Sequence, residues 1–221
     1  MTLRSDALIA VIGPTGAGKT TLVNRMSGVN FKIGYGLQSE TQQIQTAKCT
    51  LDGQRVHLID TPGFDNTEMA DGDVLYLIGT YLADIYRSGR QLTGILYLHS
   101  INSNQAGIQN IRILEKLCGD NAMASVTICT TMWNNVSEHV GAEREQELAA
   151  RLWNNMISKG ATIRRVLDPP TEEDMAYATK LCLRKPVTLD IQREIVDEGK
   201  SVFNTKAAWA LGCRGDAFWR R

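Results

Sequence analysis

The chain has 221 residues, of which 43% are hydrophobic, a length that suits one α/β domain with or without a small appendage. Lys and Arg together number 24, as do Asp and Glu, so the balance argues against nucleic-acid binding through a general basic surface. The five cysteines are scattered and include no C-x-x-C pair, which is typical of reduced thiols. Residues 1–6 run straight into a strand, and no apolar run has the length needed to span a membrane. Together these features predict a cytoplasmic protein.

Residues 13–20 match the phosphate-loop pattern G-x-x-x-x-G-K-T. The apolar run 7–12 before them is typical of a buried strand, and 21–27 read as a short helix that stops at Gly28. Glycines allow successive N–H groups to face a phosphate, and the helix N-terminus adds partial positive charge. We therefore expect nucleotide binding by Gly13, Pro14, Thr15, Gly16, Ala17, Gly18, Lys19, Thr20 and Thr21, with Lys19 on the β- and γ-phosphates and Thr20 on Mg²⁺.

The loop at 29–42 holds the position of a first switch, whose threonine binds Mg²⁺ when the γ-phosphate is present. Thr41 is the candidate for that hydroxyl, with an ordinary loop threonine as the equal alternative. Thr46 competes less well, because it falls inside the alternating run 44–51, which reads as a strand.

A second phosphate-side element follows a hairpin turn at Asp52-Gly53. The strand 54–59 ends in Asp60-Thr61-Pro62-Gly63, about 40 residues after the phosphate loop. We predict that Asp60 holds Mg²⁺ through water and that the N–H of Gly63 donates to the γ-phosphate. The metal set is thus Thr20, Thr41 and Asp60, and the catalytic set Lys19, Thr41 and Gly63.

The rest of the chain predicts alternating helices and strands. Residues 65–73 read as a polar second switch whose Asp73 caps the next helix. Further elements are expected at 74–87 (helix), 92–99 (strand), 107–118 (helix), 125–131 (strand), 142–158 (helix), 161–166 (strand), 171–182 (helix) and 188–203 (helix). The domain is expected over 1–205. The tail 206–221 either docks or is disordered, with pairing to another copy or membrane contact as weaker alternatives.

His99 lies at the carboxyl end of the expected strand 92–99, on the edge where α/β sheets place ligands. It is a tentative catalytic residue. The competing interpretation is a strand-end histidine hydrogen-bonded to backbone.

Several of these motifs together resemble one family. They are Gly13–Thr20, Ser39-Glu40-Thr41, Asp60-Thr61-Pro62-Gly63-Phe64, Thr130-Thr131-Met132-Trp133 and Leu189–Glu194. Over about residues 7–205 the chain resembles the septin-related branch of translation-factor-class GTPases, with immunity-associated GTPases, chloroplast-import receptor GTPases and small fungal G-domain proteins as the nearest in shape. The resemblance implies GTP, GDP and Mg²⁺ as cofactors, slow hydrolysis, and a homodimer across the nucleotide face.

Two positions depart from the GTPase pattern. The base-reading motif N/T-K-x-D corresponds to Thr131-Met132-Trp133-Asn134, which makes Thr131, Trp133 and Asn134 the candidate base contacts. An amide at 134 accepts hydrogen bonds without charge, so guanine should be held more weakly, and Trp133 either stacks on the base or packs against the sheet. Phe64 stands where Ras-like enzymes have the glutamine that orients the attacking water. We therefore predict very slow intrinsic GTP turnover. A dimer partner or a residue such as His99 would then supply the missing catalytic group.

These observations predict a doubly wound, mostly parallel sheet of about six strands with helices on both faces, in which the strand 44–51 is antiparallel to its hairpin partner. The predicted function is a guanine-nucleotide switch or scaffold that self-associates. The alternative is an ATP-using NTPase or a P-loop kinase. A kinase needs an arginine-bearing lid, and between residues 60 and 110 only Arg87 and Arg90 are present.

Overall fold

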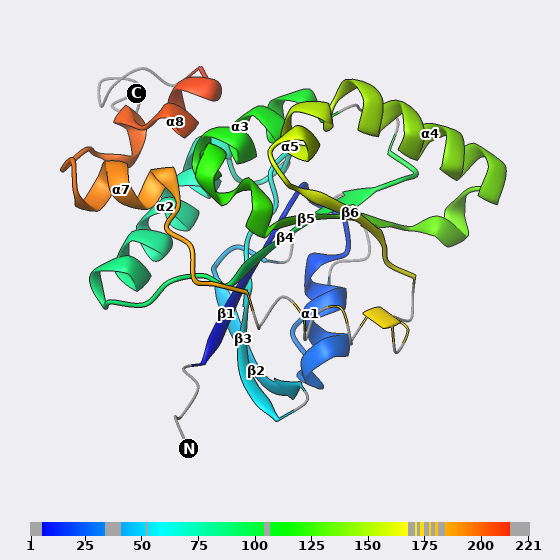
Figure 1. Cartoon of the computed structure of the whole chain (residues 1–221), viewed down its shortest axis with the longest axis horizontal. Helices are drawn as coiled ribbons and strands as arrows, with labels where there is room; N and C mark the ends of the chain where they lie inside the picture. Colours follow the sequence, from blue (N-terminus) through cyan, green and yellow to red (C-terminus); the bar gives the residue numbers. More distant parts are fainter. Residues whose placement is uncertain are drawn as a thin grey trace.

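The computed structural model describes residues 6–33, 41–51, 53–103, 107–167, 171, 173, 174, 177, 180 and 184–212. Its centre is a six-stranded sheet in the order β2-β3-β1-β4-β5-β6, which runs diagonally through Figure 1. The strands are β1 (Ala7–Ile12), β2 (Gln45–Leu51), β3 (Gln54–Asp60), β4 (Gly94–Ser100), β5 (Val126–Thr131) and β6 (Thr162–Arg165). Every neighbouring pair is parallel except β2 and β3. The predicted fold class is confirmed.

Strand burial follows the sequence pattern. All six residues of β1 and of β5 are buried, as expected for continuous apolar strands covered on both faces. In the edge strand β2, buried and exposed residues alternate in part, because one of its faces meets solvent. The parallel strands therefore place their carboxyl ends, at Ile12, Asp60, Ser100 and Thr131, along one edge of the sheet.

Helices cover both faces of the sheet (Figure 1). One face carries α1 (Lys19–Ser27), whose Leu22, Val23 and Met26 join a core with β1 and β3. The other face carries α2 (Asp71–Arg87), α3 (Ile108–Cys118), α5 (Asn154–Ser158) and α7 (Asp190–Val196). Further helical segments are α4 (Glu138–Arg151), α8 (Lys206–Ala210) and the 3₁₀ turns η1 (Asp120–Ser125), η2 (Trp133–Asn135) and η3 (Val202–Asn204).

Three helix boundaries differ from the predictions. Asp73 does not cap α2, because the helix begins at Asp71, three residues before the predicted start, and Ala70 is the residue at its N-cap. In place of the predicted helix 142–158 there are two helices, α4 from Glu138 and α5 from Asn154. The break between them is at Leu152–Trp153, where the Trp153 side chain is fully buried in the main core. The predicted helix 188–203 ends at Val196, and Gly199 then adopts a left-handed φ of 66° that a continuing helix excludes.

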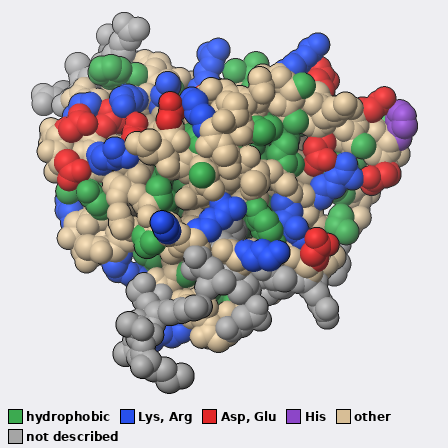
Figure 2. Space-filling model, in the orientation of Figure 1, with side chains coloured by type: hydrophobic (Ala, Val, Ile, Leu, Met, Phe, Trp, Pro, Cys, Tyr) green, Lys and Arg blue, Asp and Glu red, His purple; other side chains and the backbone are tan. Residues whose placement is uncertain are grey.

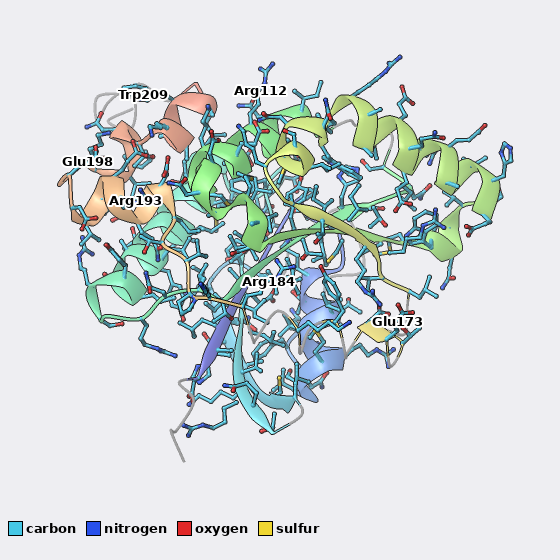
Figure 3. All side chains as sticks on the ribbon, in the orientation of Figure 1. Arg112, Glu173, Arg184, Arg193, Glu198 and Trp209 are labelled. Atoms are coloured by element: carbon cyan, nitrogen blue, oxygen red, sulfur yellow. The ribbon has the colours of Figure 1, made fainter. Side chains whose placement is uncertain are left out.

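The segment expected as a tail begins with α8, which packs on α3. Ala207 and Ala208 are fully buried in the main core, whereas Trp209 is 57% exposed on the outer side of α8 (Figure 3). Residues 213–221 and most of the predicted helix 171–182 lie outside the described residues.

The visible surface carries acidic and basic side chains side by side, notably over α7 and α4 (Figure 2). Ion pairs account for part of this mixture, including Lys206 with Asp190 and Arg151 with Glu147. Among the described helices, none is both long and apolar enough to span a bilayer.

Candidate functional site

The phosphate loop leaves β1 at Gly13, directly beside β4. A Cβ at this position would come within 2.3 Å of the Leu98 carbonyl oxygen, and the φ of 152° lies where side chains are rarely found. Only glycine therefore fits, and the loop can turn tightly over the sheet edge. Gly18, at a φ of 88°, then precedes Lys19, the first residue of α1.

Lys19 is buried, with 6% of its surface exposed. Its Nζ donates hydrogen bonds to the carbonyl oxygens of Gly13, at 3.0 Å, and Pro14, at 2.8 Å. Burial lowers the pKa of Lys19 to about 8, and the negative charge of Asp60 opposes this shift. A buried ammonium group held by two carbonyls is thus poised to gain from an anionic ligand.

Three oxygen-bearing side chains meet at the other end of the loop. The Thr20 hydroxyl donates to Asp60 Oδ2 at 2.7 Å and lies 3.1 Å from the Thr41 hydroxyl. Thr46 is not part of this group, because its hydroxyl bonds to Tyr81 at 3.0 Å. The structure therefore brings together the three predicted metal ligands and separates them from the competing threonine.

Asp60 is fully buried, yet its Oδ1 has no hydrogen-bond partner among the described residues. Burial raises the pKa of Asp60, and the hydrogen bond from Thr20 and the charge of Lys19 oppose the shift. An unpartnered buried carboxylate oxygen beside two hydroxyls is a donor set that suits a hard divalent cation such as Mg²⁺. These residues fit the cation that the motifs imply.

Gly63 and Phe64 lie directly against the phosphate loop. The N–H of Thr15 donates to the Phe64 carbonyl at 2.7 Å, and the N–H of Phe64 donates to the Gly13 carbonyl at 3.3 Å. The Phe64 side chain is 1% exposed and packs in the main core with Val74 and Leu75. An apolar, buried side chain at this position cannot orient a water molecule.

A cavity of about 70 Å³ opens beside the phosphate loop, between α1 and the ends of β5 and β6. Thr131, at its wall, donates to the Ala17 carbonyl at 2.9 Å and so fixes the β5 end to the loop. The residues that line the cavity are Gly18, Thr21, Leu22, Arg25, Thr131, Met132, Val166 and Leu167. Sequence reasoning did not name Leu22, Arg25, Met132, Val166 or Leu167 as candidate contacts. The only sequence feature that could have pointed to Val166 and Leu167 as cavity residues was their position directly after the predicted sixth strand.

Trp133 packs inside the protein and does not stack in this cavity. It is 7% exposed, its indole N–H donates to the carbonyl and hydroxyl of Thr130, and the Arg165 guanidinium lies 4.1 Å from its ring centre. Of the two predicted alternatives, the structure has the packed one. Asn134, the next residue, is exposed in η2.

His99 is enclosed rather than open to a ligand. It is 2% exposed, and its ring meets the edge of Trp153 with ring centres 5.4 Å apart. Burial lowers the pKa of His99 to about 4, so the imidazole is neutral at physiological pH. A ring that is 2% exposed and packed against Trp153 is not open to solvent, which does not favour the tentative catalytic role.

Nucleotide affinity should fall as the pH rises through about 8, since Lys19 then loses its proton in the free protein. A bound polyphosphate favours the charged lysine, so deprotonation opposes binding. Between about pH 7 and about pH 8.5 we expect GTP affinity to drop about fourfold in a fluorescence titration. Lys19→Arg, whose guanidinium stays charged, should give a flat profile, and a flat wild-type profile would contradict the assignment.

Solved structures share this fold. Toc33 from Arabidopsis thaliana, in complex with GDP and Mg²⁺, superposes with a TM-score of 0.65 at 16% identity, over 85% of this chain and 89% of that one. A second structure concerns the chloroplast translocon components atToc33 and psToc159, for whose GTPase activity dimerization is important. It superposes with a TM-score of 0.66 at 14% identity, over 83% of this chain and 86% of that one.

Curated relatives are bacterial. The tRNA modification GTPase MnmE of Azorhizobium caulinodans is 36% identical over 66 residues, 30% of this chain and 15% of MnmE. MnmE of Neisseria gonorrhoeae is 22% identical over 198 residues, 70% of this chain. That match spans 44% of MnmE, so the chain corresponds to less than half of these relatives.

Residues 8–131, more than half of the chain, match the family described as 50S ribosome-binding GTPase. This P-loop GTPase family is the one to which the chain belongs.

Proposed function

We propose that this chain binds GTP and GDP together with Mg²⁺, hydrolyses GTP slowly, and acts as a nucleotide-controlled switch or scaffold by self-association. The observation that carries the proposal is the Asp60 carboxylate, buried beside Thr20 and Thr41 with one oxygen unpartnered among the described residues. Thr20, Thr41 and Asp60 would hold Mg²⁺, which neutralises charge on the phosphates. Lys19 and the loop backbone would hold the phosphates themselves.

Slow hydrolysis is supported by Phe64. The residue after Gly63 is a core side chain with 1% exposure, so this position supplies no polar group to attacking water. We further propose that a second copy, meeting the first across the nucleotide face, completes the site, and that the chain lies in the septin-related branch. Dimerization is important for the GTPase activity of atToc33 and psToc159, and the structure described for them shares this fold. This supports the proposal that the chain forms a dimer.

The test is GTP turnover measured beside light scattering. We expect a monomeric chain to turn over far more slowly than about 1 per second, and GTP with Mg²⁺ to shift the mass toward a dimer. Rapid turnover by a monomer would overturn the hydrolysis and dimer parts of the proposal. Equal or better binding of ATP would overturn the guanine assignment.

Asp60→Asn should remove the dependence of GTP binding on Mg²⁺. The amide is neutral and holds a divalent cation far more weakly than a carboxylate, so GTP affinity in Mg²⁺ should fall at least about tenfold, toward its value in EDTA. Calorimetry with and without EDTA measures both values. Asp73→Asn, at an exposed position in the first turn of α2, is the matched control and should keep the full Mg²⁺ effect.

Asn134→Asp should tighten guanine binding. A carboxylate makes charge-assisted hydrogen bonds that are about twice as strong as neutral ones, so we expect GTP affinity to rise about tenfold while ATP affinity does not. Asn135→Asp, the exposed neighbour in η2, controls for added negative charge. If the two variants behave alike, residue 134 does not read the base.

A further inference from the structure

A second cavity, of about 500 Å³, lies at the end of the sheet opposite the phosphate loop. Its walls include the first residues of β1 and β3, the turn that follows α2 and the segment before α7. β1 begins at the lower end of the sheet in Figure 1, whereas the phosphate loop follows its carboxyl end. Small-molecule sites commonly have volumes of about 300–1,000 Å³, so this cavity has room for a ligand of its own beside a bound nucleotide.

Asp6 holds two side chains at this cavity. Strand pairing places Ala7 opposite Val56, so Asp6 lies beside the start of β3. Its Oδ1 forms an ion pair with Arg55 Nε at 2.8 Å, and its Oδ2 lies 3.0 Å from His57 Nε2. Arginine carries five N–H donors in one plane. The ion pair is made through Nε and the Arg55 side chain is 70% exposed, so its terminal nitrogens remain available to another acceptor.

Arg90 lines the same cavity from the turn after α2. It is exposed, and within the part of the chain that the structure describes its side chain forms no ion pair or hydrogen bond. Arg87, in the last turn of α2, differs in this respect, because its guanidinium pairs with Asp84 at 2.8 Å. The Arg90 guanidinium is therefore available to a ligand, whereas that of Arg87 already has an acidic partner.

The charges at this cavity favour an anion. Among the described residues that line it, two arginines stand against one aspartate, and that aspartate already contacts Arg55 and His57. The planar fork of a guanidinium matches the oxygens of a phosphate or a carboxylate and binds them through two parallel hydrogen bonds. Leu8 and Pro186 add apolar surface to the walls. This combination suits an oxyanion attached to a small organic body.

We propose that this cavity is a binding site for a small organic anion, whose phosphate or carboxylate group is held by Arg55 and Arg90. The organic part of the ligand packs on Leu8 and Pro186, and Asp6 keeps Arg55 in place. The site lies at the opposite end of the sheet from Lys19 and Asp60, so this inference goes beyond the proposed function and does not depend on it.

The test is an NMR titration that follows the imidazole Hε1 signals of the three histidines in the chain. His57 lines the cavity, His99 lies at the carboxyl end of β4, and His139 is exposed on α4. The probes are phenyl phosphate, benzoate and the neutral benzyl alcohol. We expect at least one of the two anions to shift the His57 signal with a Kd below about 10 mM, and benzyl alcohol to leave it unchanged. The anion with the lower Kd identifies the group that the arginines prefer.

Arg90→Ala should weaken binding of that anion at least about tenfold, because it removes charge-assisted hydrogen bonds. Arg87→Ala is the matched control, since it removes an exposed arginine one turn away that does not line the cavity. Its Kd should stay within about twofold of the wild type. The inference is overturned if neither anion shifts His57, if benzyl alcohol shifts it equally, if only His99 or His139 responds, or if the two variants bind alike.

Discussion

Replacing Lys19 with alanine should lower GTP affinity by at least about 30-fold. The ammonium group is buried beside the phosphate loop and its charge is disfavoured there without an anion, as its lowered pKa of about 8 indicates. Removing one partner of a buried charge pair in a complex costs about 2–5 kcal/mol, and each 1.4 kcal/mol is about tenfold in affinity. Calorimetric titration with GTP in Mg²⁺ measures the loss.

Lys48→Ala is the matched control for that variant, since Lys48 is an exposed lysine on the edge strand β2. It should bind GTP as the wild type does. A nucleotide-free melting curve checks that Lys19→Ala remains folded. If Lys19→Ala binds GTP within about threefold of the wild type while folded, the phosphates are held elsewhere and the site assignment is wrong.

Replacing Trp133 with alanine should cost about 3–5 kcal/mol in the free energy of unfolding, a large part of the roughly 5–15 kcal/mol that stabilises a typical domain. The side chain fills a space between the end of β5 and α4, where a Cβ on Gly141 would come within 2.6 Å of the ring. Its indole N–H also donates to the carbonyl and the hydroxyl of Thr130, and the Arg165 guanidinium stacks over its ring. Urea unfolding measures the change as a shift in midpoint.

Trp209→Ala provides the control, because Trp209 is 57% exposed on α8, at the opposite side of the molecule from α4 (Figures 1 and 3). It should change the free energy of unfolding by no more than about 0.5 kcal/mol. Trp133→Phe keeps most of the volume but removes the indole N–H, so it should cost about 1 kcal/mol. Equal losses from Trp133→Ala and Trp209→Ala would show that Trp133 does not anchor this loop.

The residues expected to bind the phosphates and Mg²⁺ can be predicted from the sequence, because their chemistry depends on local patterns. The glycines of residues 13–18, Lys19 and Thr20 follow a fixed spacing, and Asp60 follows a buried strand. The chain order strand, loop, helix then leaves one sheet edge on which all of them can meet. The fold class follows from the same alternation of apolar strands and one-sided helices.

The base side is less readable, because its walls come from segments far apart in the chain. Arg25 and Leu167 line the same cavity only because α1 packs against the sheet. Whether Trp133 faces a ligand or the interior depends on the fit to Gly141 and Arg165, which no local pattern encodes. The burial of His99 depends likewise on Trp153, a residue that interrupts the predicted helix 142–158 by turning into the core.

We propose that Lys19, Thr20 and Asp60 form a Mg²⁺-assisted guanine-nucleotide site. The most direct measurement is titration calorimetry of the purified chain with GTP, GDP and ATP, each with Mg²⁺ and with EDTA. We expect GTP and GDP to bind at least about tenfold more tightly than ATP, and EDTA to weaken GTP binding. Binding of ATP equal to that of GTP, or GTP affinity indifferent to Mg²⁺, would contradict it.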